Sequence, residues 1–177
     1  KKINKNKEGI LSTLRLRGPS LPVQIAKAIA VQPLFASAFL SELKTENRIK
    51  ISNMRVGSSP IYFLPGQEDK LENFVEHLNQ REREAFALLK KEQVLEDSLQ
   101  TPVVRVALRA IKDFAVPLNI RVNGELKLFW RYFTLKDDEA TDLIKKSFTE
   151  EKSPKKDGII LKFFCVGPSW IMAAIIS

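Results

Sequence analysis

Residues 22 to 64 carry the sequence pattern that most restricts how this chain can fold. Pro22 stands where the first turn of a helix tolerates proline, and Ser20 before it is a candidate N-cap. Apolar residues then recur at helical spacing in two groups, Val23, Ile25, Ala26 and Ile29, and Ala36, Phe39, Leu40 and Leu43. Pro33 separates the groups, because proline fits only the first turn of a new helix. The pattern therefore predicts two short, tightly joined helices that cross at a steep angle.

A small β-hairpin is predicted directly after the second helix. Asn47 lies at the helix end, where a residue that tolerates the left-handed conformation is needed. Ile49 and Ile51 begin a strand, residues 56–60 supply turn residues, and the chain returns through residues 61–64. Two helices followed by a hairpin form the element order of a winged helix-turn-helix.

The segment from about Lys7 to Leu64 resembles the winged helix-turn-helix regulators of bacteria and archaea. The resemblance is carried by residues at matching spacing: Ile25-Ala26-Lys27-Ala28-Ile29-Ala30-Val31, Leu40, Leu43, Asn47 and Ile49. Ala30 and Asn47 stand at two positions where family members usually have glycine. The resemblance implies a positioning helix followed by a recognition helix that lies in the DNA major groove.

The net charge of +8 is concentrated in this first module. Residues 1–66 hold 11 Lys and Arg against 3 Asp and Glu, whereas the rest of the chain is almost neutral. A basic domain attracts polyanions, because its cations displace counterions from phosphates. The predicted phosphate contacts lie at helix ends and in the hairpin: Lys27, Lys44, Arg48, Lys50 and Arg55. The alternative is a solvated basic surface without a ligand.

Two further features of the first module concern its exposed groups. Lys1, Lys2, Lys5 and Lys7 form a basic arm, which we expect to be a disordered end rather than a backbone contact. The outward positions of the second predicted helix are Leu34, Phe35, Ser37, Ala38, Ser41 and Lys44. Ser37 and Ser41 are candidate nucleic-acid contacts, but the set is poor in groups that read base edges. Leu34 and Phe35 suit a protein groove or a dimer interface better.

A second module is predicted at residues 80–135, after a linker helix at residues 67–79. Its first helix covers residues 81–95, and its second begins at Pro102, with Ser98 and Thr101 as candidate N-caps. A hairpin follows, because alternating apolar residues flank Asn123-Gly124, the strongest two-residue turn signal.

The second module has features of a repeat of the first. A shift of 68 residues places Leu40 on Leu108 and Leu43 on Ile111, which suggests tandem winged-helix units. The alternative is a helical packing or dimerisation domain with an unrelated hairpin. Arg105 and Arg109 lie four residues apart, so they share a helix face and are candidate DNA contacts. Their alternative role is ion pairing with Asp113, Glu96 or Asp97.

The chain lacks the residue sets of most enzymes, so we predict no enzymatic activity and no cofactor or metal. One pattern is an exception: Asp113 with Glu125-Leu126-Lys127 follows the order of metal-dependent nucleases, in which carboxylates hold Mg²⁺. The plainer interpretation, which we prefer, is a strand with solvent-facing Glu125 and Lys127.

The C-terminal part is predicted to contain a helix from Asp137 to Phe148 within a charged region, residues 136–157, and an apolar segment, residues 158–177, with a strand at residues 159–166. Lys162 and Gly167-Pro168-Ser169 divide the segment, and a membrane span needs about 20 uninterrupted apolar residues. No leader peptide begins the chain, so secretion is not predicted; a fragment of a longer protein remains an open alternative.

These observations lead to one leading hypothesis and one alternative. We expect an α+β, mainly helical fold with a winged helix-turn-helix, in one copy or in tandem. The leading function is double-stranded DNA binding by a transcriptional regulator or chromosome-associated factor. With Cys165 as its single cysteine, no disulfide forms within the chain, which suits a cytoplasmic, nucleoid-associated protein. The alternative is a homodimerisation or protein-interaction module of the same fold that does not contact DNA.

Overall fold

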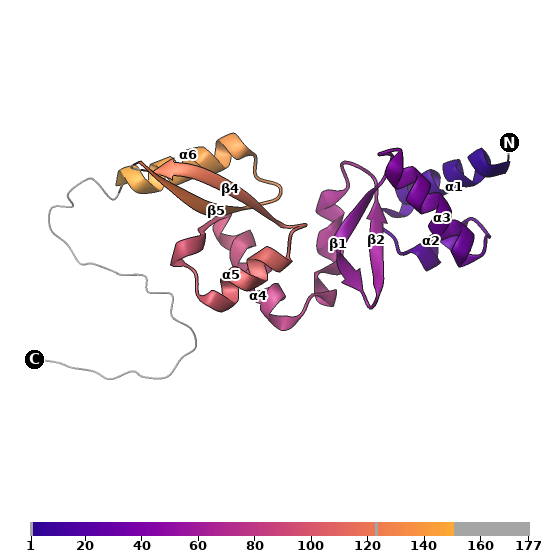
Figure 1. The fold of residues 1–177 in the computed structure, drawn as a ribbon, viewed down its shortest axis with the longest axis horizontal. Coiled ribbons are helices and arrows are strands. Elements are labelled where there is room, and N and C mark those ends of the chain that lie inside the picture. The colour runs from indigo at the N-terminus through magenta and orange to yellow at the C-terminus, as the bar shows by residue number, and fades with distance from the viewer. Residues whose placement is uncertain (1, 123, 151–177) are drawn as a thin grey trace, which may run out of the picture.

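The computed structural model describes residues 2–122 and 124–150. Its first unit contains three helices and a hairpin: α1 (Lys2–Arg17), α2 (Pro22–Ala28), α3 (Pro33–Thr45), β1 (Lys50–Val56) and β2 (Ser59–Phe63). The 3₁₀ helix η1 (Glu68–His77) leads to a second unit, which contains α4 (Gln80–Glu92), β3 (Val94–Glu96), η2 (Asp97–Leu99), α5 (Pro102–Ala110), β4 (Ala115–Val122), β5 (Glu125–Tyr132) and α6 (Asp137–Glu150). The predicted class, α+β and mainly helical with small antiparallel hairpins, is confirmed. The two units lie end to end (Figure 1).

The first helix was not expected. Instead of a disordered basic arm, α1 runs from Lys2 and buries Ile10, Leu11 and Leu14. Lys7 reaches across to α3, where its ammonium lies 2.8 Å from a Glu42 oxygen and 2.6 Å from a Glu46 oxygen. The prediction of a disordered end is therefore wrong over the described part of α1, because its apolar residues complete the core behind α2 and α3.

The two predicted helices meet as the sequence indicates, at an angle of 107°. Ala30, in the turn between them, has φ +53°, and Asn47, after α3, has φ +56°. Both therefore adopt the left-handed conformation that favours glycine. Two details differ from expectation. Ser20 does not cap α2, because its hydroxyl donates to the Gly18 carbonyl, and Val23 is 61% exposed rather than inward-facing.

Each unit has a small antiparallel sheet. In the first, β1 pairs with β2, and Ser20 adds an isolated bridge to Tyr62. In the second, the order is β3-β5-β4, and the predicted hairpin turn joins Val122 to Glu125. The helix predicted to reach residue 95 is wrong at its end: α4 stops at Glu92, and the next residues form β3.

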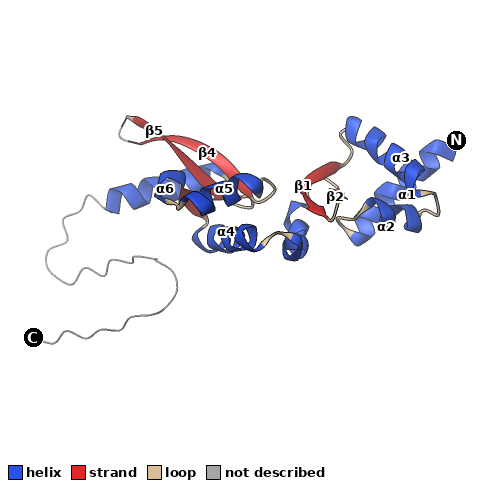
Figure 2. Ribbon diagram, turned by 60° about the horizontal axis from the view of Figure 1, so that its bottom comes forward, coloured by secondary structure: helices blue, strands red, loops and turns tan. Residues whose placement is uncertain are grey.

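The β1–β2 hairpin contributes to two hydrophobic clusters. Alternate residues of a strand point to opposite faces of its sheet. Ile61 and Phe63 accordingly join the larger cluster with α4, α5 and β5, whereas Tyr62 and Leu64 pack against the cluster of α1, α2 and α3. Figure 2 shows the hairpin in red between the helices of the first unit and the second unit. The β1–β2 hairpin therefore packs against both hydrophobic cores, one on each face.

One carboxylate of the second unit fastens β1 to it. The pairing of β1 with β2 is irregular between Ile51 and Arg55. Asp113 accepts hydrogen bonds from residues in this stretch, from the Ser52 hydroxyl at 2.8 Å, the Met54 amide at 2.9 Å, the Asn53 amide at 3.1 Å and the Asn53 side chain at 3.3 Å. Asp113 therefore satisfies backbone donors that the bulged strand leaves without a partner on β2.

Within residues 2–122 and 124–150, no single helix is both long and apolar enough to span a membrane. The helices α2 and α3 reach that length and composition only when they are taken together, across their 107° bend. The predicted strand at residues 159–166 and the remaining apolar segment lie outside the described residues.

Removal of the Asp113 carboxylate should destabilise the junction between the two units. In the Asp113→Ala variant, the Ser52 hydroxyl and the Asn53 amide lose their acceptor, the Met54 amide keeps only the Ser52 hydroxyl oxygen, and we expect the free energy of unfolding to fall by roughly 2–4 kcal/mol. Urea unfolding followed by circular dichroism measures this loss. Glu125→Ala, which removes an exposed carboxylate at the far end of the β4–β5 hairpin, is the matched control. Equal stability of the two variants would contradict the role given to Asp113.

Candidate nucleic-acid interface

The exposed face of α3 is the surface that the sequence assigned to nucleic acid. Ser37, Ser41 and Lys44 lie on it and are exposed, as are Leu34 at 76% and Phe35 at 54%. The Ser37 hydroxyl donates to the Pro33 carbonyl of its own helix at 2.9 Å, and the Ser41 carbonyl accepts from Thr45 at 3.0 Å. The face is therefore short of strong hydrogen-bond donors, and Lys44 supplies its positive charge.

Three of the five predicted phosphate contacts, Lys27, Lys44 and Arg55, form no ion pair in the described part of the chain. Lys27, at the end of α2, and Lys44, near the end of α3, are exposed and form no ion pair there. The Arg55 guanidinium donates to the Ser58 carbonyl at 2.9 Å, within the turn of its own hairpin. Since a carbonyl is neutral, the positive charge of Arg55 is not cancelled by this contact.

Arg48 and Lys50 are neutralised by carboxylates. Arg48 lies 2.7 Å from a Glu8 oxygen on α1, and its positive charge lowers the pKa of Glu8 through a hydrogen bond. Lys50 lies 2.7 Å from a Glu68 oxygen on η1. These pairs are exposed and individually weak. Even so, each leaves less net charge for a phosphate than the sequence suggested.

Arg105 and Arg109 converge on Asp97 instead of standing free. Arg105 Nε lies 2.8 Å from Asp97 Oδ2, and Arg109 Nη1 lies 2.9 Å from Asp97 Oδ1. The Trp130 indole also donates to Oδ1 at 2.8 Å, and the Arg109 guanidinium stacks over its ring at 5.5 Å. The alternative role, ion pairing with Asp97, is confirmed.

The environment of Asp97 explains its ionised form. Its side chain is 7% exposed, and burial alone would raise its pKa. Hydrogen bonds from Arg109, Trp130 and Arg105 outweigh burial, so the pKa of Asp97 lies below its ordinary value. The buried Asp97 carboxylate therefore connects α5 to β5, because it binds Arg105 and Arg109 on α5 and Trp130 on β5.

The residues of the nuclease-like pattern do not meet. Asp113 lies just before β4 and binds β1, whereas Glu125 pairs with Val122 at the opposite end of the hairpin. Seven residues of strand separate those ends, roughly 23 Å at 3.3 Å per residue. Lys127 lies 3.0 Å from Glu96. Asp113 and Glu125 therefore cannot share a metal ion, and within residues 2–122 and 124–150 no three His, Cys, Asp or Glu side chains group as ligands.

Sequence reasoning missed exposed groups on α1, since it did not predict that helix. Arg15 and Arg17 are exposed near its C-terminal end and flank Leu16, which is 88% exposed. The apolar triplet Ile10, Leu11 and Leu14 is the signal that would have located the helix.

Comparison with protein families, with curated protein sequences and with solved structures found no match to this chain.

Replacement of Asp97 should destabilise the second unit in a pH-dependent way. A carboxyl group whose folded pKa is lowered stabilises the protein above the ordinary pKa, about 3.9, and loses that contribution as the pH falls through the folded value. We expect Asp97→Asn to lower the free energy of unfolding by roughly 2 kcal/mol at pH 7, a value reduced because both arginines are half-exposed.

The difference from the wild type should shrink progressively below about pH 4, as measured by denaturant titration across pH. Asp142→Asn, an exposed carboxylate of α6, is the control and should change little. A deficit for Asp97→Asn that stays constant down to pH 2 would show that Asp97 does not act through its charge.

Proposed function

We propose that the protein consists of two winged-helix units and binds duplex DNA through the first of them. The element order supports this proposal: a helix, a bridging strand residue, two helices at 107° and a hairpin. That angle is within the range of about 90–120° for helix-turn-helix pairs. In this interpretation α2 is the positioning helix and α3 the recognition helix.

The second unit supports the tandem interpretation. Its α4, β3, η2, α5 and β4–β5 hairpin follow the order of α1, the Ser20 bridge, α2, α3 and the β1–β2 hairpin. In each unit the segment after the first helix joins the second strand of the hairpin, through an isolated bridge from Ser20 to Tyr62 in one and through β3 and Trp130 in the other. Tyr62 and Trp130 are 68 residues apart, the shift that also relates Leu40 to Leu108, and both leucines are fully buried.

One observation carries the DNA proposal: Lys27 and Lys44 are exposed near the ends of the two crossing helices and form no ion pair with any residue that the structure describes. Lysines at such positions can contact phosphates on either side of a groove that receives α3. The hydroxyls of Ser37 and Ser41 offer little base discrimination, so binding is expected to be general for duplex sequence. A chromosome-associated role fits such binding better than a strict operator-specific one.

Neutralisation of these two lysines tests the proposal. The double variant Lys27→Gln and Lys44→Gln should weaken binding to random duplex about tenfold or more at low salt. It should also reduce the slope of log K against log salt by about 2, since each lost phosphate contact contributes about 0.9. Fluorescence anisotropy at several salt concentrations measures both quantities.

The control pair is Lys91→Gln and Lys136→Gln, two exposed lysines of the second unit, which should leave the slope unchanged. Lys50→Gln is expected to have a smaller effect than either Lys27→Gln or Lys44→Gln, because Glu68 already compensates Lys50. Equal losses in the test and control pairs, or no duplex binding by the wild type, would refute the proposed interface.

A second candidate function is self-association or protein binding through the start of α3. The exposure of Leu34 and Phe35 side by side favours it, because a large apolar pair on a recognition helix suits a protein surface. Sedimentation velocity of the wild type and of Phe35→Asp separates the possibilities. Monomeric behaviour of both proteins, with DNA binding intact in Phe35→Asp, would argue against a homodimer interface there.

A further inference from the structure

The exposed side of α5 is apolar along most of its length. Val103 is 45% exposed and Val106 is 69% exposed, while Pro102 and Ala110 are exposed at the two ends. The opposite face already fills the core through Ala107, Leu108 and the following Ile111. Val103, Val106 and Ala110 are spaced by three and four residues, the spacing with which one helix packs along another.

This strip forms one wall of a groove of about 360 Å³. The floor and one side come from Pro102, Val103, Val106, Ala107 and Ala110 of α5, and the other side comes from Asn79, Arg81 and Glu82 at the start of α4. Asn79 and Glu82 are occupied with each other: each accepts from the other's backbone amide, at 2.9 and 3.1 Å. The groove is therefore apolar along α5, and at the α4 edge Asn79 and Glu82 are already hydrogen-bonded to each other.

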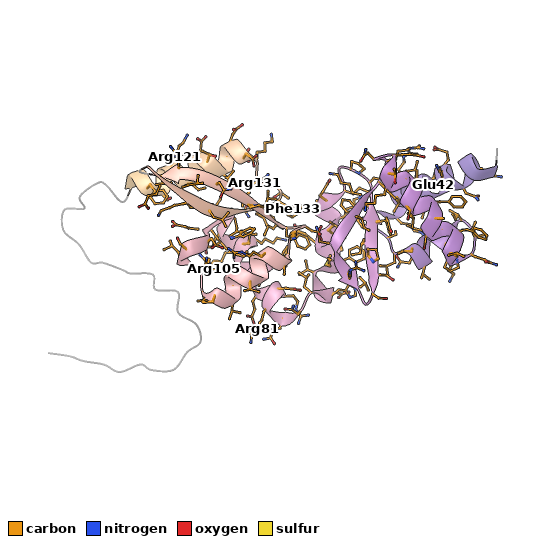
Figure 3. All side chains as sticks on the ribbon, viewed as in Figure 1. Glu42, Arg81, Arg105, Arg121, Arg131 and Phe133 are labelled. Carbon is orange, nitrogen blue, oxygen red and sulfur yellow. The ribbon has the colours of Figure 1, made fainter. Side chains whose placement is uncertain are left out.

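The flank of α5 next to the groove carries an excess of positive charge, although its arginines do not line the groove itself. Arg105 and Arg109 share the single carboxylate of Asp97, and their side chains remain 44% and 45% exposed. Lys112 is exposed one turn further along the chain. On the α4 edge, Arg81 forms no ion pair in the described residues, and the Glu84 carboxylate accepts from Gln80 at 3.1 Å. Figure 3 labels Arg81 and Arg105 in the lower half of the second unit.

We propose that this groove binds an amphipathic helix of a partner protein, with aliphatic residues at three- and four-residue spacing and carboxylates along the flank that faces Arg105 and Arg109. The aliphatic residues pack on Val103 and Val106, and the carboxylates complement the two guanidiniums. The strip from Pro102 to Ala110 is about 12 Å long at 1.5 Å per residue, so roughly two turns of the partner make contact. This site lies in the second unit and is independent of the DNA surface of the first.

The test uses the full chain and a fluorescein-labelled 16-residue peptide. The peptide carries leucines at positions 3, 6, 10 and 13, glutamates along one flank and alanine or glutamine elsewhere. Its partner peptide has lysines in place of the glutamates. Anisotropy titrations should show saturable binding of the glutamate peptide that is at least tenfold tighter than binding of the lysine peptide.

Variants locate the binding on the groove. Val106→Glu and Val106→Ser should each weaken the glutamate peptide tenfold or more, the first by charge and lost contact and the second by lost contact alone. Leu126→Glu, which is equally exposed at 68% but lies on β5, should bind as the wild type does. Circular dichroism verifies that each variant is folded.

Four outcomes would overturn the proposal: no saturable binding of the glutamate peptide, equal binding of both peptides, binding unchanged in both Val106 variants, or equal weakening by Leu126→Glu. Loss of duplex DNA binding in Val106→Ser, with peptide binding intact, would instead assign the face to nucleic acid.

Discussion

The β1–β2 hairpin lies against both hydrophobic clusters, and this shared position constrains the rest of the molecule. Its alternate residues serve different cores, so neither face of β2 is free: Ile61 is fully buried on one side, and Tyr62 packs on the other. Full burial of side chains such as Ile61 and Phe63 stabilises by about 1.5–3 kcal/mol each. The Asp113 carboxylate fixes the position of β1 relative to the second unit, because it binds residues 52–54 of β1 from the segment that follows α5.

This arrangement changes how the positive charge of the first unit is used. A hairpin with both faces free would present its cations to a phosphate backbone, but here the β1–β2 hairpin packs against the second unit, and Lys50 at the start of β1 contacts η1. Lys50 pairs with Glu68, and Arg48 is held by Glu8 of the helix that completes the same core. Of the phosphate contacts that the sequence predicts in the first unit, those without an ion pair in the described residues are Lys27 and Lys44, near the ends of α2 and α3, and Arg55 on β1. Duplex binding is therefore proposed to depend on the crossing helices, with Arg55 near the end of β1 as an additional contact.

Local sequence patterns located several of the elements but not the long-range contacts between them, and they did not locate α1 or β3. Pro33 and Pro102 marked the starts of α3 and α5, and Asn123-Gly124 marked the turn between β4 and β5, because proline geometry and turn chemistry act over a few residues. The contacts of Asp113 with residues 52–54 span about 60 positions and have no local signature. The pairing of Lys7 with Glu42 and Glu46 was missed for the same reason. The helix α1 itself did have a local signal, the apolar residues Ile10, Leu11 and Leu14. The ion pairs of Arg105 and Arg109 with Asp97 could be considered from the sequence, because Asp97 is only 8 and 12 residues away. The sequence offered them as an alternative to DNA contacts and did not decide between the two.

The most direct test of the account is a map of the DNA-binding surface at single residues. Nuclear magnetic resonance of ¹⁵N-labelled protein, titrated with a 15-base-pair duplex of arbitrary sequence, reports each backbone amide separately. The account predicts the largest shift changes at the end of α2 around Lys27 and along the exposed positions of α3 up to Lys44, with small changes in residues 52–54, which Asp113 already holds. Changes concentrated on α5 or on the strands of the β1–β2 hairpin, with α3 unaffected, would contradict it.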